Sequence, residues 1–157
     1  MEKVFIFDLD NTLYQQPSNV HNMSMNTFYN SLPRDLELRK LLLSLKNIYV
    51  FTNGNGRHLE NCINYMGLRG CFKDATYRDL FKNKLKPSLN PYILSYYRFN
   101  LIHKNVFFFE DTLANLRTGK IMGWITVYIN KILPEHKPYY IDYMFTNIKS
   151  AINSIKL

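Results

Sequence analysis

Apolar residues are concentrated in short runs along the chain, and several of these runs stop abruptly at polar side chains. The runs are rich in valine, isoleucine, phenylalanine and tyrosine, a composition typical of strands buried on both faces of a sheet. This pattern predicts strands in the following segments: Val4–Asp8, Asn47–Thr52, Ala75–Tyr77, Asn105–Phe109, Trp124–Ile129 and Tyr143–Phe145.

The segments between these runs carry the spacing and the flanking residues of helices. Leucines crowd one such segment, and a glycine follows the last apolar residue of two others, which is a common stop signal. The predicted helices are Leu36–Leu45, Arg57–Met66, Asn90–Ile102, Thr112–Met122 and Ile148–Ile155. The segment Tyr14–Asn30 has no clean period and is predicted to be a short helix or an irregular flap. Strands that alternate with helices predict an α/β fold in which helices cover both faces of a parallel sheet.

Two carboxylates, Asp8 and Asp10, stand at the carboxyl end of the first predicted strand. Leu9 points the other way in extended geometry, so both acids can face the crevice where α/β proteins hold their ligands. Two close carboxylates repel each other unless a cation lies between them, and oxygen ligands without cysteine or histidine favour a hard ion such as Mg²⁺. The alternative is an aspartate-rich turn in which Asn11 and Thr12 serve as turn and capping residues.

Two further strands also end in polar side chains. Thr52 ends the second strand, and Glu110 and Asp111 follow the most apolar strand of the chain. Because parallel strands bring their carboxyl ends to one edge of a sheet, these groups are expected to converge with the two aspartates of the first strand. Pro87 keeps Lys86 out of the helical conformation, which predicts an extended turn at this lysine. Acids, a hydroxyl and a lysine at one edge describe a site for a phosphate group held with Mg²⁺.

The segment Thr52–Gly56 has two interpretations. Gly54 and Gly56 match the start of a dinucleotide fingerprint, but Leu59 stands where the third glycine is required, which disfavours that interpretation. The favoured interpretation is a hydroxyl and backbone N–H groups presented between a strand and a helix, an arrangement that suits phosphoryl oxygens.

Composition limits the class of protein. The chain has 157 residues, 46% of them hydrophobic, which predicts one domain with a substantial core. No apolar run approaches the roughly 20 residues of a membrane span, and acids interrupt the apolar N-terminus, so neither a membrane segment nor a signal peptide is expected. Cys62 and Cys71 lack metal-ligand and redox spacing and are interpreted as reduced structural thiols, which favours a cytoplasmic location. The histidines are interpreted as surface or half-buried residues without ligand spacing, with His21 a candidate substrate contact.

The net charge of +8 favours phosphorylated or polyanionic partners. The basic residues are spread along the chain and form no long run of the kind that marks a nucleic-acid-binding arm. Nucleotides and nucleic-acid ends both fit this charge.

Four short motifs occur in order along nearly the whole chain: D-L-D-N-T-L from Asp8, F-T-N-G from Phe51, K-P from Lys86 and E-D-T-L-A-N-L from Glu110. Together they resemble the four motifs of the haloacid dehalogenase-like (HAD) hydrolase superfamily. The resemblance implies a Rossmann-like three-layer sandwich with a parallel central sheet. Within the superfamily, F-E-D-T-x-x-N-L followed by G-W-x-T-V looks most like the pyrimidine 5′-nucleotidase branch.

The resemblance also implies a role for each motif residue. Asp8 would attack phosphorus and form an aspartyl-phosphate, and Asp10 would act first as general acid and then as general base. Thr52 would bind phosphoryl oxygens, and Lys86 would offset the negative charge of the nucleophile and the phosphate. Further substrate contacts are expected from Asn53, through its N–H group, and from Gly54 and Thr12.

The implied Mg²⁺ ligands are Asp8, the backbone carbonyl of Asp10, and Asp111. Alignment of the fourth motif places Asp111, and not Glu110, at the usual metal ligand. Asn115 then occupies a place where many relatives carry a second acid.

The sequence differs from this branch at the cap, a large helical insertion that members of the branch carry after the first motif. Here only residues 14–33 are available for a cap, within a single core domain of residues 1–157. A cap this short predicts an open site, because caps exclude water and contact the substrate. Two hypotheses follow: weak discrimination among small phosphate esters, or a large substrate that itself covers the site. An oligomer that shields the site is a further alternative.

The sequence therefore predicts a Mg²⁺-dependent phosphomonoesterase that acts on nucleotides or other small phosphate esters. One alternative is a phosphatase acting on a macromolecule, either a nucleic-acid end or a phosphoprotein. Another is a catalytically silent binding protein, which the presence of all the motif residues disfavours. Dehalogenase chemistry is disfavoured because Asp10 supplies the acid and base that phosphoryl transfer needs.

Overall fold

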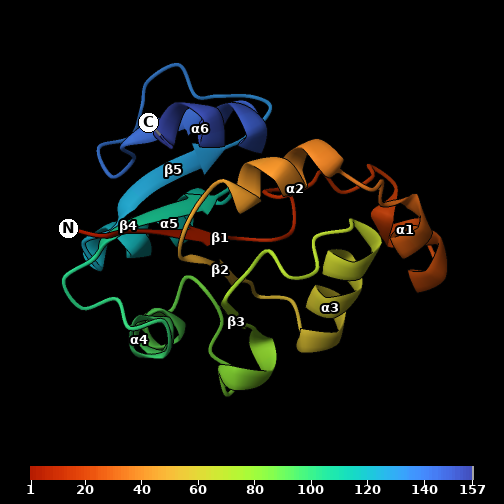
Figure 1. Cartoon of the computed structure of the whole chain (residues 1–157), viewed down its shortest axis with the longest axis horizontal. Helices are drawn as coiled ribbons and strands as arrows, with labels where there is room; N and C mark the ends of the chain where they lie inside the picture. Colours follow the sequence, from red (N-terminus) through yellow and green to blue (C-terminus); the bar gives the residue numbers. More distant parts are fainter. Residues whose placement is uncertain (157) are drawn as a thin grey trace.

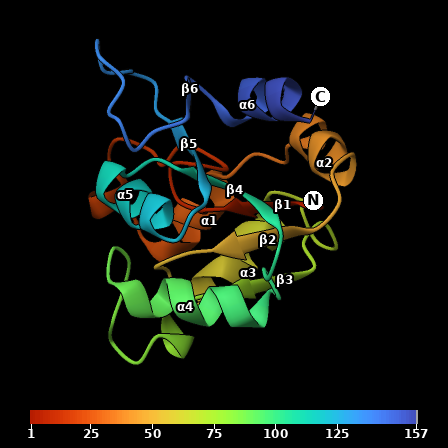
Figure 2. The same cartoon turned by 90° about the vertical axis from the view of Figure 1, so that its left-hand side faces the viewer.

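The computed structural model describes residues 1–156 as a six-stranded parallel sheet between two layers of helices (Figures 1 and 2). The strand order is β3-β2-β1-β4-β5-β6, and every neighbouring pair is parallel. The strands are β1 Lys3–Phe7, β2 Ile48–Phe51, β3 Asp74–Thr76, β4 Asn105–Glu110, β5 Ile125–Ile129 and β6 Tyr143–Phe145. The predicted α/β fold and parallel sheet are confirmed.

The helices fall into two groups according to the face of the sheet that they cover. The first face buries side chains of α1, α2, α3 and α6, and the opposite face buries side chains of α4 and α5. The helices are α1 Met25–Ser31, α2 Leu36–Leu43, α3 Gly56–Tyr65, α4 Leu89–Arg98, α5 Leu113–Ile121 and α6 Ile148–Ile155, with 3₁₀ turns η1 Val20–Asn22 and η2 Arg78–Leu80. Among the described residues, none of these helices has the length and hydrophobicity that crossing a membrane requires.

Alternate residues of the central strands fill the two faces. Phe107 and Phe109 of β4 join the core under α2, α3 and α6, whereas Phe108 joins the core under α4 and α5. The ring of Phe7 on β1 stacks on that of Phe109, with centroids 4.5 Å apart. Because both faces are buried, the interiors of β1 and β4 are entirely apolar, and polar residues begin where these strands reach the edge of the sheet.

Local polar contacts set the ends of the helices. Asn55 caps α3, since its Oδ1 accepts the backbone N–H of His58 at 2.8 Å. The helix predicted over Asn90–Ile102 is observed only over Leu89–Arg98. It ends early because Asn100 has a φ of 51°, a left-handed conformation that asparagine tolerates and that stops a helix.

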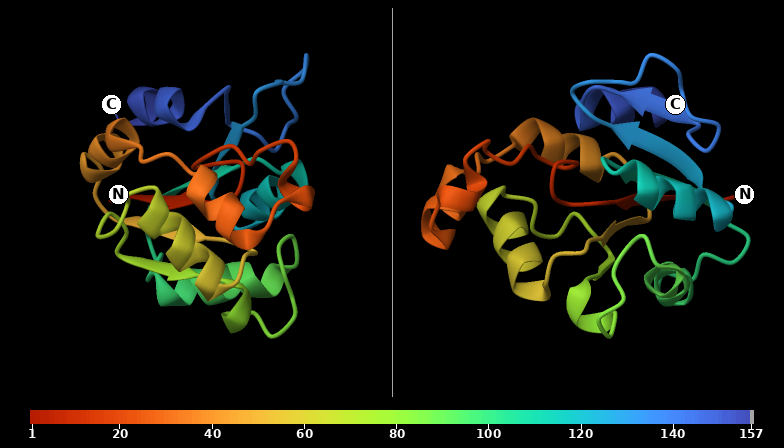
Figure 3. Two further views of the ribbon diagram at one scale, coloured as in Figure 1. Left: turned by 90° about the vertical axis from the view of Figure 1, so that its right-hand side faces the viewer. Right: turned by 180° about the vertical axis from the view of Figure 1, so that it is seen from behind.

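Residues 14–33 combine both structures that were predicted as alternatives for this part of the chain. An irregular stretch and η1 come first, and α1 follows beside α3 (Figure 3). Phe28 and Tyr29 of α1 are buried, and the ring of Phe28 meets that of Tyr14 edge-on at 6.2 Å. This segment therefore packs against the core domain through aromatic side chains.

Candidate active site

Asp8 follows β1 directly at the edge of the sheet and is almost fully buried. Its backbone N–H donates to the carbonyl oxygen of Phe109 at 2.9 Å, which extends the pairing of β1 with β4 by one residue. The chain then turns at Asn11, where φ is 60°, and Thr12 donates its hydroxyl to Oδ2 of Asp8 at 3.0 Å. Thr12 is buried and its hydroxyl orients the carboxylate of Asp8, while its contact with a substrate stays a prediction.

Lys86 reaches Asp8 from the loop before α4. Its Nζ donates to Oδ1 of Asp8 at 3.1 Å and to the carbonyl oxygen of Phe51 at 2.7 Å. The same buried amine lies 3.6 Å from Oε1 of Glu110. Burial alone would lower the pKa of Lys86, but the charges of Asp8 and Glu110 hold it above its usual range. Lys86 is therefore a fixed positive charge beside Asp8.

Asn53 holds the loop that carries Lys86. Its Oδ1 accepts the backbone N–H of Lys86 at 2.9 Å, and its Nδ2 donates to the backbone carbonyl of Lys86 at 3.0 Å. Thr52 is buried beside it and accepts the N–H of Gly54 at 3.0 Å. At Gly54 a Cβ atom would come within 2.9 Å of the His58 ring, so glycine allows the loop to approach α3 closely. The side-chain clamp by Asn53 was not predicted.

Three carboxylates gather where β1 and β4 end. Asp8, Glu110 and Asp111 each place an oxygen within 4.8 Å of the other two. Burial and the charge of Asp8 raise the pKa of Glu110 well above its usual range, and the same causes raise the pKa of Asp111 to about 7. Burial also opposes ionisation of Asp8, but the Lys86 charge and hydrogen bonds hold the pKa of Asp8 below its usual range. One ammonium thus faces three carboxylates and cannot neutralise all of them.

This donor set fits a hard divalent cation. Glu110 is buried and accepts hydrogen bonds from Nδ2 of Asn115 and from the backbone N–H of Asp111. Asp111 is only partly buried and can offer its carboxylate to an ion. Carboxylate oxygens are the ligands that Mg²⁺ prefers in proteins, and a bound cation would favour their ionised forms. Asn115, the position that the resemblance aligns with a second acid, donates a hydrogen bond to Glu110.

A cavity of about 200 Å³ brings these groups together. Its lining residues are Asp8, Asp10, Asn11, Thr52, Asn53, Lys86, Glu110, Asp111, Thr112 and Asn115. The residues predicted for catalysis and metal binding therefore meet in one place, whereas Gly54 and Thr12 lie outside this lining. A larger groove of about 730 Å³, bordered by α3 and β3, contains none of the predicted site residues.

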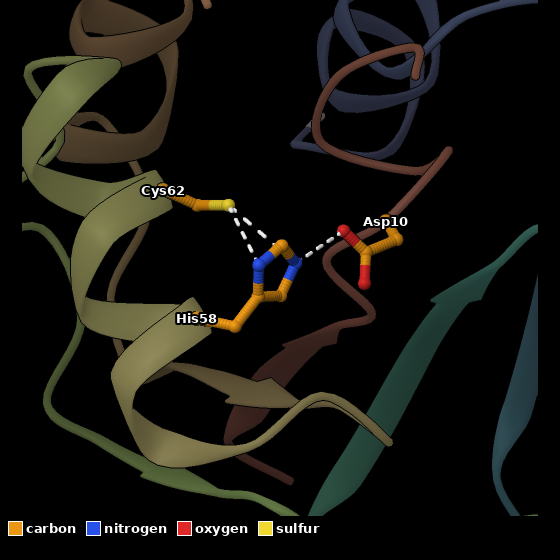
Figure 4. A group of neighbouring side chains, drawn as sticks. All are labelled: Asp10, His58 and Cys62. Atoms are coloured by element: carbon orange, nitrogen blue, oxygen red, sulfur yellow. Dashed lines mark hydrogen bonds and ion pairs between the residues drawn. The ribbon is translucent and has the colours of Figure 1, made fainter. Parts of the chain in front are cut away.

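Asp10 faces a second group of side chains, of which Figure 4 shows the two from α3, and residues 14–33 contribute the others. Its Oδ1 accepts hydrogen bonds from Nε2 of His58 at 2.8 Å and from the hydroxyl of Tyr14. The other ring nitrogen of His58, Nδ1, lies 2.8 Å from the hydroxyl of Tyr29. The hydrogen bond to Asp10 is the largest cause that raises the pKa of His58 to about 11, so Asp10 faces an imidazolium at neutral pH.

Sequence reasoning missed this second group. His58 is half-buried, as the sequence predicted for the histidines, but its contact with Asp10 makes it part of the site. His21, the predicted candidate, is exposed in η1 and does not line the cavity. The signal in the sequence was the four-residue spacing of His58 and Cys62, which places two side chains on one face of a helix.

Solved structures match the fold over its whole length, although no model of a known protein family and no curated protein matches the sequence. An L-2-haloacid dehalogenase from Xanthobacter autotrophicus has a TM-score of 0.77 at 12% identity, with 99% of each chain covered. A protein assigned as a beta-phosphoglucomutase from Thermotoga maritima has a TM-score of 0.74 at 17% identity, again over 99% of each chain. The HAD hydrolase YfnB from Bacillus subtilis, solved with bound magnesium, has a TM-score of 0.73 at 13% identity over 99% of each chain.

Identities this low establish the fold alone, and they do not distinguish the pyrimidine 5′-nucleotidase branch from others. The chain shares the Rossmann-like α/β fold of these three proteins.

The carboxylate cluster predicts how Mg²⁺ changes the thermal stability of the protein. We expect Mg²⁺ at about 100 times its Kd to raise the Tm by about 5–10 °C, because the ion binds only the folded cluster. Asp111→Asn should lose most of this shift. Without Mg²⁺ the same variant should melt above the wild-type protein, because one of the mutually repelling carboxylates is gone.

Thermal unfolding with MgCl₂ or EDTA measures both effects. Glu60→Gln, at an exposed position on α3, is the matched control and should respond to Mg²⁺ as the wild-type protein does. An equal Mg²⁺ shift in Asp111→Asn would contradict the assignment of this cluster as the ion site.

Proposed function

We propose that the chain is a Mg²⁺-dependent phosphomonoesterase that works through an aspartyl-phosphate on Asp8. The observation that carries this proposal is the contact of 3.1 Å between the buried Lys86 ammonium and Asp8, beside the carboxylates of Glu110 and Asp111. A buried carboxylate kept ionised by a fixed cation is a nucleophile that does not lose its charge to protonation at neutral pH. The fold similarity to HAD proteins supports the same chemistry.

The first step transfers the phosphoryl group to the protein. A carboxylate oxygen of Asp8 forms a bond to phosphorus as the bond from phosphorus to the leaving oxygen breaks, and Asp10 donates a proton to that oxygen. Lys86 offsets the charge that accumulates on the phosphoryl oxygens, which also accept hydrogen bonds from Thr52 and the N–H of Asn53.

The second step returns Asp8 to its starting state. Asp10, now ionised, accepts a proton from a water molecule whose oxygen bonds to phosphorus, and the bond between phosphorus and the Asp8 oxygen breaks. Asp8, Asp111 and the backbone carbonyl of Asp10 would hold Mg²⁺, which when bound supplies positive charge for the phosphoryl oxygens.

The dimensions of the site favour a small phosphate ester with a polar leaving group. The cavity of about 200 Å³ suits a phosphoryl group, and a second hollow of about 320 Å³ shares Asn11 and Asp111 with it. This second hollow is also bordered by Gln15, Asn130 and Lys131, which can contact a sugar or base through hydrogen bonds. A nucleotide of the kind used by the pyrimidine 5′-nucleotidase branch fits this polarity and the net charge of +8.

Residues 14–33 are proposed to act as a reduced cap. Their one helix, α1, packs on α3 through Tyr29 and leaves the second hollow open. An open site also admits a phosphate group on a macromolecule, so phosphorylated oligonucleotides and peptides belong in any substrate panel.

Release of phosphate from p-nitrophenyl phosphate tests the proposed reaction. The wild-type protein should turn over with Mg²⁺ and not with EDTA. Asp8→Asn should lose about 10³-fold or more of kcat, because the amide cannot form the intermediate. Activity that survives in Asp8→Asn would rule out this nucleophile, and the absence of activity on a full panel of esters would favour a binding role.

The contact of His58 with Asp10 predicts a loss that depends on the leaving group. His58→Gln should lower kcat/KM for an alkyl phosphate about tenfold, because Asp10 then loses the hydrogen bond from Nε2 that orients its carboxyl group toward the leaving oxygen. For p-nitrophenyl phosphate, whose leaving group needs little protonation, kcat/KM should change much less. His103→Gln, at an exposed position, is the control. Equal losses on both esters would show that His58 supports only the fold.

A further inference from the structure

A second set of ligand atoms is formed by Asp10 with side chains that do not belong to the carboxylate cluster. His58 and Cys62 are four residues apart on α3, so their side chains project from the same face of the helix (Figure 4). The Cys62 sulfur lies 3.6 Å from Nε2 of His58, and Oδ1 of Asp10 lies 2.8 Å from that same nitrogen. One atom from each of the three residues falls within 4.8 Å of the other two. A separation of 3.6 Å suits two ligands of one tetrahedral ion, whereas Oδ1 and Nε2, now joined by a hydrogen bond, would move apart by roughly 0.5 Å to bind an ion between them.

The imidazole of His58 is already oriented for such an ion. The hydroxyl of Tyr29 lies 2.8 Å from Nδ1, which leaves Nε2 directed at Asp10. Histidines that bind metals usually donate the N–H of their second nitrogen to an oxygen in this way, which fixes the tautomer and the plane of the ring. The packing of Tyr29 on the His58 ring, with centroids 5.7 Å apart, adds a second constraint.

The chemistry of the three donors differs from that of the carboxylate cluster. A thiolate, an imidazole nitrogen and one carboxylate oxygen suit Zn²⁺, whereas Mg²⁺ prefers oxygen ligands alone. Cys62 is a free cysteine, so its sulfur is available for an ion. Its sulfur is buried and lies 3.6 Å from Nε2 of His58, a residue that is itself only half-buried.

We propose that Asp10, His58 and Cys62 form a binding site for Zn²⁺ or a similar borderline-soft ion, distinct from the proposed Mg²⁺ site. Oδ1 of Asp10, Nε2 of His58 and Sγ of Cys62 are the ligands, and the fourth position of a tetrahedral ion is left to water or a substrate oxygen. The ion replaces the proton between His58 and Asp10 and the thiol proton of Cys62, and both protons are released to solvent.

Occupation of this site inhibits the enzyme. A carboxylate of Asp10 that is bound to Zn²⁺ cannot donate a proton to the leaving oxygen or accept one from water. This consequence rests on the proposed function, whereas binding of the ion does not. Inhibition should therefore occur without displacement of Mg²⁺ from the carboxylate cluster.

Binding is tested with Co²⁺, which gives a charge-transfer absorption band when a thiolate coordinates it. The titration contains excess Mg²⁺, so that the carboxylate cluster is occupied. The wild-type protein and Cys71→Ser should show the band with one equivalent of Co²⁺, and one equivalent of Zn²⁺ should abolish it. Cys62→Ser should lack the band, and His58→Gln, which removes a direct ligand, should weaken Zn²⁺ binding by more than the roughly 100-fold that loss of an outer-shell partner costs.

Cys71→Ser is a matched control, because Cys71 is the second buried free cysteine and lies outside the cluster. The inference is overturned if the band is absent from the wild-type protein, if it survives in Cys62→Ser, or if it disappears in Cys71→Ser.

An activity measurement then separates this inference from the proposed function. Cys62→Ser should keep its Mg²⁺-dependent phosphate release, which also shows that it is folded, while its Zn²⁺ concentration for half-inhibition rises about 100-fold. Inhibition by Zn²⁺ at the same concentration in Cys62→Ser and the wild-type protein would overturn the inhibitory role. A Co²⁺ band in a protein without phosphatase activity would support the ion site and contradict the proposed function.

Discussion

The ion pair between Lys86 and Asp8 is the interaction on which the rest of the site depends. The ammonium is buried, 3.1 Å from Asp8 and 3.6 Å from Glu110, and it also donates to the backbone carbonyl of Phe51. Removing one partner from such a pair would leave an uncompensated charge in the interior, which is strongly unfavourable. The fold therefore holds the lysine at both ends: Asn53 fixes its backbone and the three oxygens fix its amine. Because Asp8 follows β1, Phe51 ends β2 and Glu110 ends β4, the Lys86 ammonium also links these three strands.

Two carboxylates one residue apart acquire different roles because their surroundings differ. Asp8 points into a buried cluster where Lys86 keeps it ionised, which suits a nucleophile. Asp10 lies at the border of the cavity, where His58 and Tyr14 hold one of its oxygens. Pairs of acids whose environments separate in this way are the usual basis of acid and base assignments in enzymes. The contact of Asp10 with α3 also connects the active site to residues 14–33 through Tyr29.

Much of this arrangement could be predicted from the sequence, because its signals are local. The apolar strands predict a parallel sheet, and the sheet predicts that Asp8, Thr52 and Asp111 meet at one edge. Contacts between distant side chains could not be predicted. The Asn53 clamp on the Lys86 loop and the pairing of His58 with Asp10 each depend on how neighbouring elements are placed in space.

The error in the predicted end of α4 has a different origin. Helical spacing continues through Phe99, but Asn100 adopts a left-handed conformation. The left-handed conformation of Asn100 therefore ends the helix, although the helical spacing of apolar residues continues up to this position.

The central claim, that Asp8 forms a covalent intermediate, is tested most directly by trapping that intermediate. The protein would be mixed with Mg²⁺ and a phosphate ester labelled in its phosphoryl group, quenched in acid during turnover, and mapped by peptide digestion. The account predicts an acid-stable, hydroxylamine-sensitive phosphoryl group on Asp8, and none on Asp8→Asn. Turnover without labelled protein, or a label on any other residue, would contradict it.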